Sequence, residues 1–246
     1  MQRYFVTEPS LFVGQKVTIR GEDFHHIVRV MRMKSGQQVI VAAAGQVGLA
    51  SITAIGKDTV EVTIEELLVK DAEPPIFVTL IQGLPKGEKI DSIIRQACEV
   101  GVTQISIFTA MRSVGCVPWD KKEQRLSRWR KMAKESAEQA QRRRIPEIDH
   151  YDHLEQAILA LPDQAVVLVP YEAQDLNLPT LKQQIQELDR TINHVAIVIG
   201  PEGGFDTKEI DQLKERQGRL LTLGPRILRT ETAGIVVAAN LLYEWN

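Results

Sequence analysis

Hydrophobic residues follow two different patterns along this chain. Over the first seventy or so residues they form short runs separated by turn glycines, and these runs cover residues 16–20, 38–42, 49–55 and 59–65. Runs of this length and spacing are typical of strands in a small barrel. One helical pattern interrupts them at residues 21–30. The first part of the chain therefore predicts a small β domain.

From residue 76 onward, strand-like and helix-like patterns alternate. Apolar runs predict strands at 76–82, 104–108, 166–169, 195–199 and 220–223, and amphipathic patterns predict helices at 88–100, 121–143, 178–188, 208–217 and 232–245. This alternation favours an α/β domain with a mostly parallel sheet covered on both faces. A polar segment ending in Pro74 and Pro75 separates the two patterns, and the proline pair disfavours helix. We place the domain boundary there, between residues 1–72 and 73–246.

Two glycine-containing loops follow buried strands in the second domain. The run 195–199 ends at GPEGG (residues 200–204), and the run 220–223 ends at GPRILRTET (residues 224–232). Glycine lets the backbone turn sharply and approach a ligand closely. In open α/β sheets, ligands bind where strands end and loops begin. The two loops therefore predict one shared pocket, although such glycines can also serve only to make tight turns.

Two nucleotide-binding alternatives fit this pocket poorly. A dinucleotide fold needs GxGxxG in its first strand-to-helix turn and an acidic residue about 20 positions later. The sequence GPEGGF does not have that spacing, and the chain contains no Walker A sequence. NAD and NTP binding are therefore disfavoured.

Four motifs in order give the chain a family resemblance. They are FHHIVRVMRMKSG at 24–36, LPKGEKIDSIIRQACEVGV at 84–102, GPEGG at 200–204 and LGPRILRTETA at 223–233. Together they resemble the SPOUT methyltransferases and, among these, the ribosomal RNA small subunit methyltransferase E family. That family methylates N3 of a uridine in small-subunit (16S) rRNA. The resemblance implies a C-terminal SPOUT α/β domain with a deep trefoil knot, an N-terminal PUA-like RNA-binding β-barrel, and a homodimer.

The same resemblance implies that S-adenosylmethionine is the cofactor. The two loops and the end of strand 166–169 would then form the walls of its pocket. The cofactor-binding residues expected on this basis are Val169, Pro170, Gly200, Pro201, Glu202, Gly203, Leu223, Gly224, Ile227, Leu228, Thr230 and Thr232.

Charged residues near the second loop are candidates for the chemistry. Arg226 and Arg229 lie three residues apart, and an arginine there could hold an RNA phosphate or the uracil oxygens bidentately. The alternative is that they pair with Glu231 or Glu202. Uracil N3–H must lose its proton, so a carboxylate or a positioned water is also required. The catalytic candidates are Arg229, Glu231, Glu172 and Glu202. Methyl transfer then needs only in-line positioning, with no metal.

Basic residues are concentrated in one segment, although the whole chain carries a net charge of only −2. Residues 121–144 contain ten Lys or Arg and three Glu, which favours contact with RNA phosphates. A solvated charged face is the alternative. The RNA-binding candidates are Arg128, Arg142, Arg143, Arg144 and Arg226, then Arg29, Arg32 and Lys34 in the first domain, and Lys86 and Lys89 in a strand-to-helix loop.

The remaining features narrow the class of protein. No apolar stretch approaches a membrane span and no signal peptide opens the chain, so we expect a cytoplasmic protein. The two cysteines, Cys98 and Cys116, lack metal-ligand spacing. The paired histidines His25 and His26 are interpreted as packing or surface residues, so no metal is expected. Two functions stay open beside uridine N3 methylation: a SPOUT enzyme acting on ribose 2′-O or another base, and a non-catalytic RNA-binding ribosome assembly factor.

Overall fold

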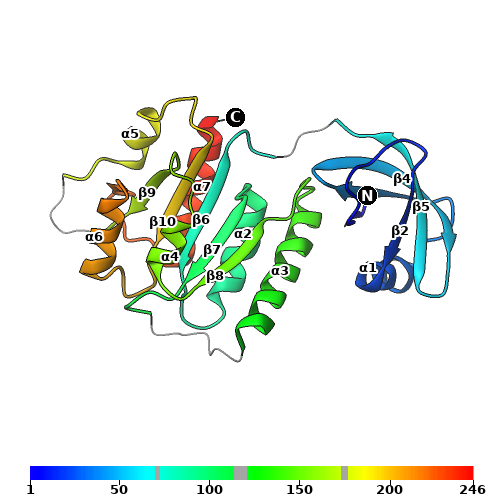
Figure 1. Ribbon diagram of the computed structural model, residues 1–246, viewed down its shortest axis with the longest axis horizontal. Coiled ribbons are helices and arrows are strands. Elements are labelled where there is room, and N and C mark those ends of the chain that lie inside the picture. The colour runs from blue at the N-terminus through cyan, green and yellow to red at the C-terminus, as the bar shows by residue number, and fades with distance from the viewer. Residues whose placement is uncertain (70–72, 114–120, 173–176, 246) are drawn as a thin grey trace. The chain divides into compact units, whose positions relative to one another are not determined.

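The computed structural model describes residues 1–69, 73–113, 121–172 and 177–245 (Figure 1). Cys116 and residues 70–72 of the predicted linker lie outside the described residues. The chain forms two compact units. The first comprises Met1–Glu73 and Ala137–Ile145, and the second comprises Pro74–Ser136 and Pro146–Asn246.

A five-stranded sheet forms the first unit. Its strands are β1 (Arg3–Phe5), β2 (Lys16–Arg20), β3 (Gln38–Ala43), β4 (Gln46–Ile55) and β5 (Thr59–Leu67), in the order β1-β3-β4-β5-β2. The four predicted strands are confirmed. Strand β1 was not predicted because three residues are too few to show an alternating pattern. The predicted helix is confirmed as α1 (Gly21–His25), which continues as a π-helix over His26–Val30.

The two outer strands of this sheet share one hydrophobic core. Tyr4 of β1 packs in the same buried cluster as Val17 and Ile19 of β2, together with Phe24 and Ile27 from the helical segment. In β2 the residues on either side of Val17 and Ile19 are more exposed, as the alternation of side chains across a strand requires. Because both edges contribute to one core, the sheet is curled around the helical segment.

The carboxylate of Glu73 binds residues 142–144, which belong to the segment 137–145 of the first unit. Oε2 of Glu73 accepts a hydrogen bond from Nη2 of Arg142 at 2.6 Å, and Oε1 accepts from the backbone amides of Arg143 at 2.7 Å and Arg144 at 3.1 Å. Arg142 is only 2% exposed, and its carbonyl oxygen accepts from the guanidinium of Arg3. A segment far along the sequence is therefore fastened to the N-terminal sheet.

Removing this carboxylate should destabilise the first unit. We expect Glu73→Ala to lower the free energy of unfolding by roughly 3 kcal/mol, because breaking one side of a buried ion pair leaves a costly buried charge. Urea unfolding measures the change, and Glu66→Ala, at an exposed position of β5, is the matched control. Equal stability of the two variants would contradict the assigned role of Glu73.

The second unit is built on a six-stranded sheet. Its strands are β6 (Phe77–Gly83), β7 (Gln104–Phe108), β8 (Glu147–Tyr151), β9 (Val166–Pro170), β10 (His194–Ile199) and β11 (Arg219–Leu221), in the order β11-β9-β10-β6-β7-β8. All five strand pairings are parallel, which confirms the predicted parallel sheet. Strand β8 was not predicted, since its sequence EIDHY is mostly polar and lies at the sheet edge.

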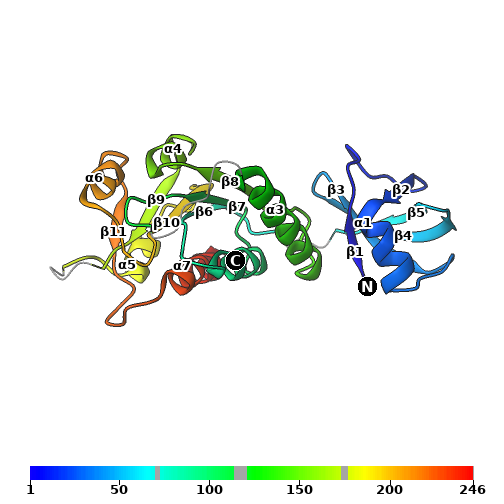
Figure 2. The same ribbon diagram turned by 90° about the horizontal axis from the view of Figure 1, so that it is seen from below.

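Helices cover both faces of this sheet. Helices α4 (Leu154–Leu159) and α6 (Thr207–Glu215) lie on one face, and α2 (Lys89–Val100), α5 (Leu181–Gln186) and α7 (Thr230–Trp245) lie on the other (Figure 2). Helix α3 (Lys122–Gln139) packs Trp129 near His150 of β8. The short helix α4 was not predicted. Helix α3 ends before the predicted residue 143, because residues 142–144 turn to meet Glu73.

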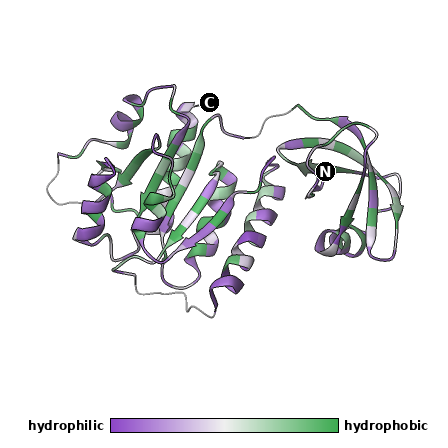
Figure 3. Cartoon of the chain, in the orientation of Figure 1, coloured by the Kyte–Doolittle hydropathy of each residue, from purple (hydrophilic) through white to green (hydrophobic). Residues whose placement is uncertain are grey.

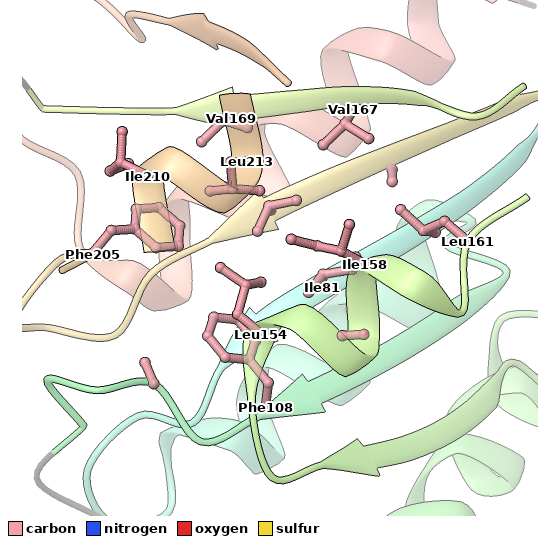
Figure 4. Packing of buried hydrophobic residues seen from close by; sticks show 14 of the residues in the cluster. Ile81, Phe108, Leu154, Ile158, Leu161, Val167, Val169, Phe205, Ile210 and Leu213 are labelled. Carbon is pink, nitrogen blue, oxygen red and sulfur yellow. The ribbon is translucent and has the colours of Figure 1, made fainter. Parts of the chain in front are cut away.

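The central strands β9, β10 and β6 are mostly apolar because both faces of the sheet are covered there (Figure 3). All six residues of β10 are buried. On one face, Leu154 and Ile158 of α4, Leu213 of α6, Val169 of β9 and Phe205 belong to one buried hydrophobic cluster (Figure 4). None of the helices in the described part of the chain is long and apolar enough to cross a membrane.

Buried His150 should make stability depend on pH. Burial lowers the pKa of His150 below its ordinary 6.5, and the charge of Lys122 acts in the same direction. The unfolded chain therefore binds a proton before the folded one does, so the free energy of unfolding falls as pH drops through about 6.5. We expect urea unfolding to show a smaller loss between about pH 7.5 and about pH 5.5 for His150→Gln than for the wild type.

The exposed His25 supplies the control for this measurement. His25→Gln should retain the wild-type pH dependence. If His150→Gln and His25→Gln behaved alike, burial of His150 would not be the source of the acid sensitivity.

Candidate functional site

Three loops meet at one edge of the parallel sheet. Strands β9 and β10 are neighbours, as are β9 and β11, so their carboxyl ends point the same way. The loops that follow them form a cleft of about 560 Å³. A second compartment of about 430 Å³ adjoins it and shares Pro170, Tyr171, Glu172, Ile227, Leu228 and Ala233. The shared pocket expected from the two glycine loops is therefore present.

Most of the predicted cofactor residues line these compartments. The larger cleft is lined by Pro170, Gly200, Pro201, Glu202, Gly203, Ile227, Leu228 and Thr230, and the smaller one adds Leu223 and Gly224. Val169 is instead fully buried within β9. Thr232 is exposed at the start of α7, and neither it nor Val169 is among the described residues that line the two compartments.

Some residues that line the two compartments were not among the predicted site residues. They are Arg112, Tyr171, Ile199, Gly204, Phe205, Thr222, Pro225 and Ala233. Most of these residues lie within or beside the motifs: Gly204 and Ala233 are motif residues, Phe205 follows the GPEGG motif, and Tyr171 follows the predicted Pro170. Arg112 comes from the loop after β7, and no motif marks it.

Close packing explains one glycine of the GPEGG loop. A Cβ atom on Gly203 would lie 2.9 Å from the carbonyl oxygen of Arg112, closer than real Cβ contacts. The next residue, Gly204, has a φ of +68°, which side chains rarely adopt. Nη2 of Arg112 also lies 3.4 Å from Oδ2 of Asp206. The loop after β7 therefore supports one wall of the cleft.

A buried hydroxyl connects three segments behind the cleft. Thr230, the first residue of α7, donates from Oγ1 to the carbonyl oxygen of Gly200 at 2.7 Å. The same hydroxyl accepts from Nε2 of Gln82 in β6 at 2.8 Å, and Gln82 is fully buried. This chain of hydrogen bonds fixes the start of α7 and the GPEGG loop to the end of β6. The hydroxyl of Thr230 is thus already engaged within the protein.

Replacing this hydroxyl should weaken the fold. We expect Thr230→Val, which keeps the side-chain shape, to lower the free energy of unfolding by about 1–3 kcal/mol, because it leaves buried polar groups of Gln82 and Gly200 unpaired. Thr230→Ser retains the hydroxyl and is the matched control. Thermal or urea unfolding makes the comparison. A valine variant as stable as the serine variant would argue against the hydrogen-bond chain.

Charged side chains gather at the rim of the cleft around Lys89. Its Nζ lies 2.7 Å from Oε1 of Glu202 and 3.6 Å from Oε2 of Glu231. Glu202 also accepts from the backbone amide of Lys86, at 3.2 and 3.3 Å to its two oxygens. Partial burial would raise the pKa of Glu202, but hydrogen bonds from Lys89 and from backbone amides lower it overall. Glu202 therefore stays ionised and is a weak proton acceptor.

The two arginines of the second loop are less constrained. Arg229 lines the larger cleft, but its side chain is 81% exposed and its Nη1 lies 4.0 Å from Oε1 of Glu231. An exposed pair at that distance contributes little. Arg226 is exposed and lines the smaller compartment. The alternative for these arginines was a salt bridge to Glu231 or Glu202. Arg229 approaches only Glu231, at 4.0 Å, whereas Lys89 lies closer to both carboxylates.

Much of the basic segment is used in contacts within the protein. Arg128 forms an ion pair with Asp91, and Arg130 donates from Nε to the carbonyl oxygen of Ile148 at 3.3 Å. Arg143 donates from Nε to the carbonyl oxygen of Gly45 at 2.7 Å. Arg142 is buried against Glu73, so the RNA contact predicted for Arg142 does not fit its position.

Other predicted RNA-binding residues lie at the surface. Arg29, Arg32, Lys34, Lys86 and Arg144 are exposed. Arg32 has a φ of 52°, in a region that non-glycine residues seldom occupy and that often marks a functional position. Among the described residues, no group of three His, Cys, Asp or Glu is placed to hold a metal ion.

Comparison with known proteins defines the class to which this fold and cleft belong. Residues 72–242 match the family model of the RNA methyltransferase domain, and residues 19–65 match that of the RNA methyltransferase PUA domain. The ribosomal RNA small subunit methyltransferase E of Bacillus subtilis (strain 168) is 34% identical over 99% of this chain and 97% of its own. The chain belongs to the ribosomal RNA small subunit methyltransferase E family.

Two further proteins of the same name resemble this chain, one in sequence and one in structure. The protein of the same name from Buchnera aphidicola subsp. Schizaphis graminum is 31% identical over 94% of this chain and 92% of its own. A crystal structure of ribosomal RNA small subunit methyltransferase E from Neisseria gonorrhoeae, bound to S-adenosyl methionine, has a TM-score of 0.87 and 26% identity, and covers 100% of this chain and 98% of that one.

Proposed function

We propose that this protein transfers a methyl group from S-adenosylmethionine to N3 of a uridine in small-subunit (16S) rRNA. The observation that carries the proposal is the cleft at the ends of β9, β10 and β11. Two of the three loops that form its walls belong to the family motifs. A full-length relative named for this reaction class supports the RNA substrate, and a cofactor-bound relative supports the cofactor.

The lining of the cleft suits S-adenosylmethionine. This cofactor supplies an activated methyl group on a cationic sulfonium, and Glu172 lines the cleft with a carboxylate. The glycine loops at 200–204 and 223–228 offer backbone groups for its adenine and ribose, and Tyr171 and Leu228 offer apolar surface. Gly203 has no room for a side chain on the side of Arg112. The residues present therefore fit the cofactor.

The proposed catalytic residues divide by their surroundings. Glu172 is exposed and lines both compartments, so its carboxylate is accessible to a uracil that enters the cleft from solvent. Glu202 and Glu231 both approach Lys89, so they serve less readily as proton acceptors. Arg229, exposed at the mouth of the cleft, is positioned to hold a phosphate or an oxygen of the target base.

The proposal also assigns a role to each domain and includes a knot and a dimer. Residues 1–72 would form a PUA-like RNA-binding barrel, with Arg29, Arg32, Lys34, Arg143 and Arg144 facing RNA. Residues 73–246 would form the methyltransferase domain, with Lys86, Lys89, Arg128 and Arg226 as further contacts. A trefoil knot is supported by the strand order, in which β11 pairs with β9 before α7 returns to β10 and β6. We also propose a cytoplasmic homodimer that needs no metal.

Calorimetric titration and nucleoside analysis test this function. We expect S-adenosylmethionine to bind and NAD, the control, not to bind. Digestion of methylated small-subunit rRNA followed by mass spectrometry should then yield N3-methyluridine. A 2′-O-methylated nucleoside or a different methylated base would replace the assigned reaction with another SPOUT activity. Absence of both binding and methylation would favour a non-catalytic RNA-binding assembly factor.

A side chain at Gly203 should interfere with cofactor binding. Gly203→Val places its Cβ within 2.9 Å of the Arg112 carbonyl oxygen, so the GPEGG loop must shift into the cleft or away from it. We expect at least about a tenfold loss of affinity for S-adenosylmethionine in calorimetry, equivalent to about 1.4 kcal/mol. Circular dichroism checks that the variant is folded. Unchanged affinity in a folded variant would remove Gly203 from the cofactor site.

A further inference from the structure

We propose that Lys89 is a catalytic residue whose ammonium group stabilises the negative charge that develops on the uracil oxygens during methylation. Glu202 and Glu231 act as positioning residues that hold this ammonium group at the cleft. The inference rests on the proposed uridine N3 chemistry and adds to it the cation that this chemistry requires.

The position of Lys89 is unusual for a lysine. It is the first residue of α2, and a cation at a helix N-terminus is disfavoured by the helix dipole. Two carboxylates nevertheless converge on it from distant parts of the sequence, Glu202 in the GPEGG loop and Glu231 in α7. Its side chain is 36% exposed and lines the larger cleft. Helix stability does not explain a cation held in this place.

The two carboxylates differ in what they do for Lys89. Glu202 makes a hydrogen bond at 2.7 Å and is itself fixed by the amide of Lys86. Oε2 of Glu231 lies 3.6 Å from Nζ of Lys89, and Glu231 is not among the described residues that line the cleft. An ammonium group has three N–H donors. With one donated to Glu202, others can face a ligand in the cleft.

Lys89 is better fixed than the other cations that line the larger cleft in the described part of the chain. The side chain of Arg229 is 81% exposed, and that of Arg112 is 50% exposed and pairs with Asp206. Electrostatic stabilisation is strongest when the charge is already in place before the reaction. Among these cations, Lys89 meets that requirement best.

The chemistry needs a fixed cation rather than a base at this position. N3–H gives its proton to solvent water, and the resulting negative charge is shared between N3, O2 and O4 of uracil. N3 then forms a bond to the methyl carbon while the carbon–sulfur bond breaks and sulfur keeps its electron pair. The hydrogen bond with Glu202 and the charges of both carboxylates raise the pKa of Lys89. Lys89 therefore stays protonated and acts on O2 or O4.

The substrate itself offers a direct test. Lys89→Met removes the charge but keeps much of the length, and Lys214→Met, at an exposed position of α6 that pairs only loosely with Asp211, is the matched control. Small ribosomal subunits would be reconstituted with RNA transcribed with either uridine or 5-fluorouridine triphosphate. Fluorine withdraws electrons, so N3–H of the fluorinated base ionises more readily and depends less on a stabilising cation.

We expect Lys89→Met to slow single-turnover methylation of uridine RNA by about 10- to 100-fold, at or below the lower end of the loss seen when one transition-state donor is removed, because Lys89 is partly exposed. On fluorinated RNA the loss should shrink to a few-fold. Lys89→Arg should keep most of the wild-type rate, and Lys214→Met should match the wild type on both RNAs. Calorimetry of S-adenosylmethionine should show little change for Lys89→Met, and any loss of RNA affinity in filter binding should be smaller than the loss of rate.

Three results would overturn the inference. They are an equal loss on both RNAs, a wild-type rate for Lys89→Met, or a lost affinity for RNA that accounts for the whole defect. Mass spectrometry of the wild-type product tests the proposed uridine N3 methylation independently of the role of Lys89. If wild-type protein forms N3-methyluridine and Lys89→Met fails the comparison, only the role of Lys89 is wrong. If another nucleoside is formed, the N3 assignment and this role are both wrong.

Discussion

Parallel pairing of β9 with both β10 and β11 is the constraint on which the candidate site depends. Parallel strands end at the same edge of a sheet, so residues that follow position 170, position 199 and position 221 meet in space. No local property of any one loop creates the cleft. Each loop contributes one wall, and the pairing of the strands determines that the walls face one another.

Two kinds of interaction then act on these loops with different consequences. Behind the cleft, the hydroxyl of Thr230 lies between Gln82 and Gly200 in a buried hydrogen-bond chain, where unpaired groups would be costly. At the rim, Lys89 meets Glu202 and Glu231 at partly exposed positions, where ion pairs add little to stability. The buried chain is therefore suited to holding the loops in place. The contacts of Lys89 with Glu202 and Glu231 are better explained by a role in placing a positive charge beside a ligand.

The larger helices and strands and the location of the cleft could be predicted from the sequence. Most of the side-chain contacts that support the cleft could not. The apolar run of β10 and the two glycine loops were strong signals, because a strand buried on both faces has a continuous hydrophobic sequence. Strand β8 and helix α4 were missed because one is a mostly polar edge strand and the other has six residues. Gln82 and Arg112 contribute through contacts across the fold. Such contacts leave no local pattern in the chain.

The basic segment shows why charge counts alone are a poor guide to an RNA-binding surface. Residues 121–144 carry a large positive excess, yet Arg128 pairs with Asp91 and Arg142 is buried against Glu73. The same Glu73 binds the amides of Arg143 and Arg144, so this part of the run is built into the first unit. A carboxylate at position 73 thereby fixes where Arg144 emerges at the surface. Part of the basic charge serves to assemble the fold, and only the remainder is available to RNA.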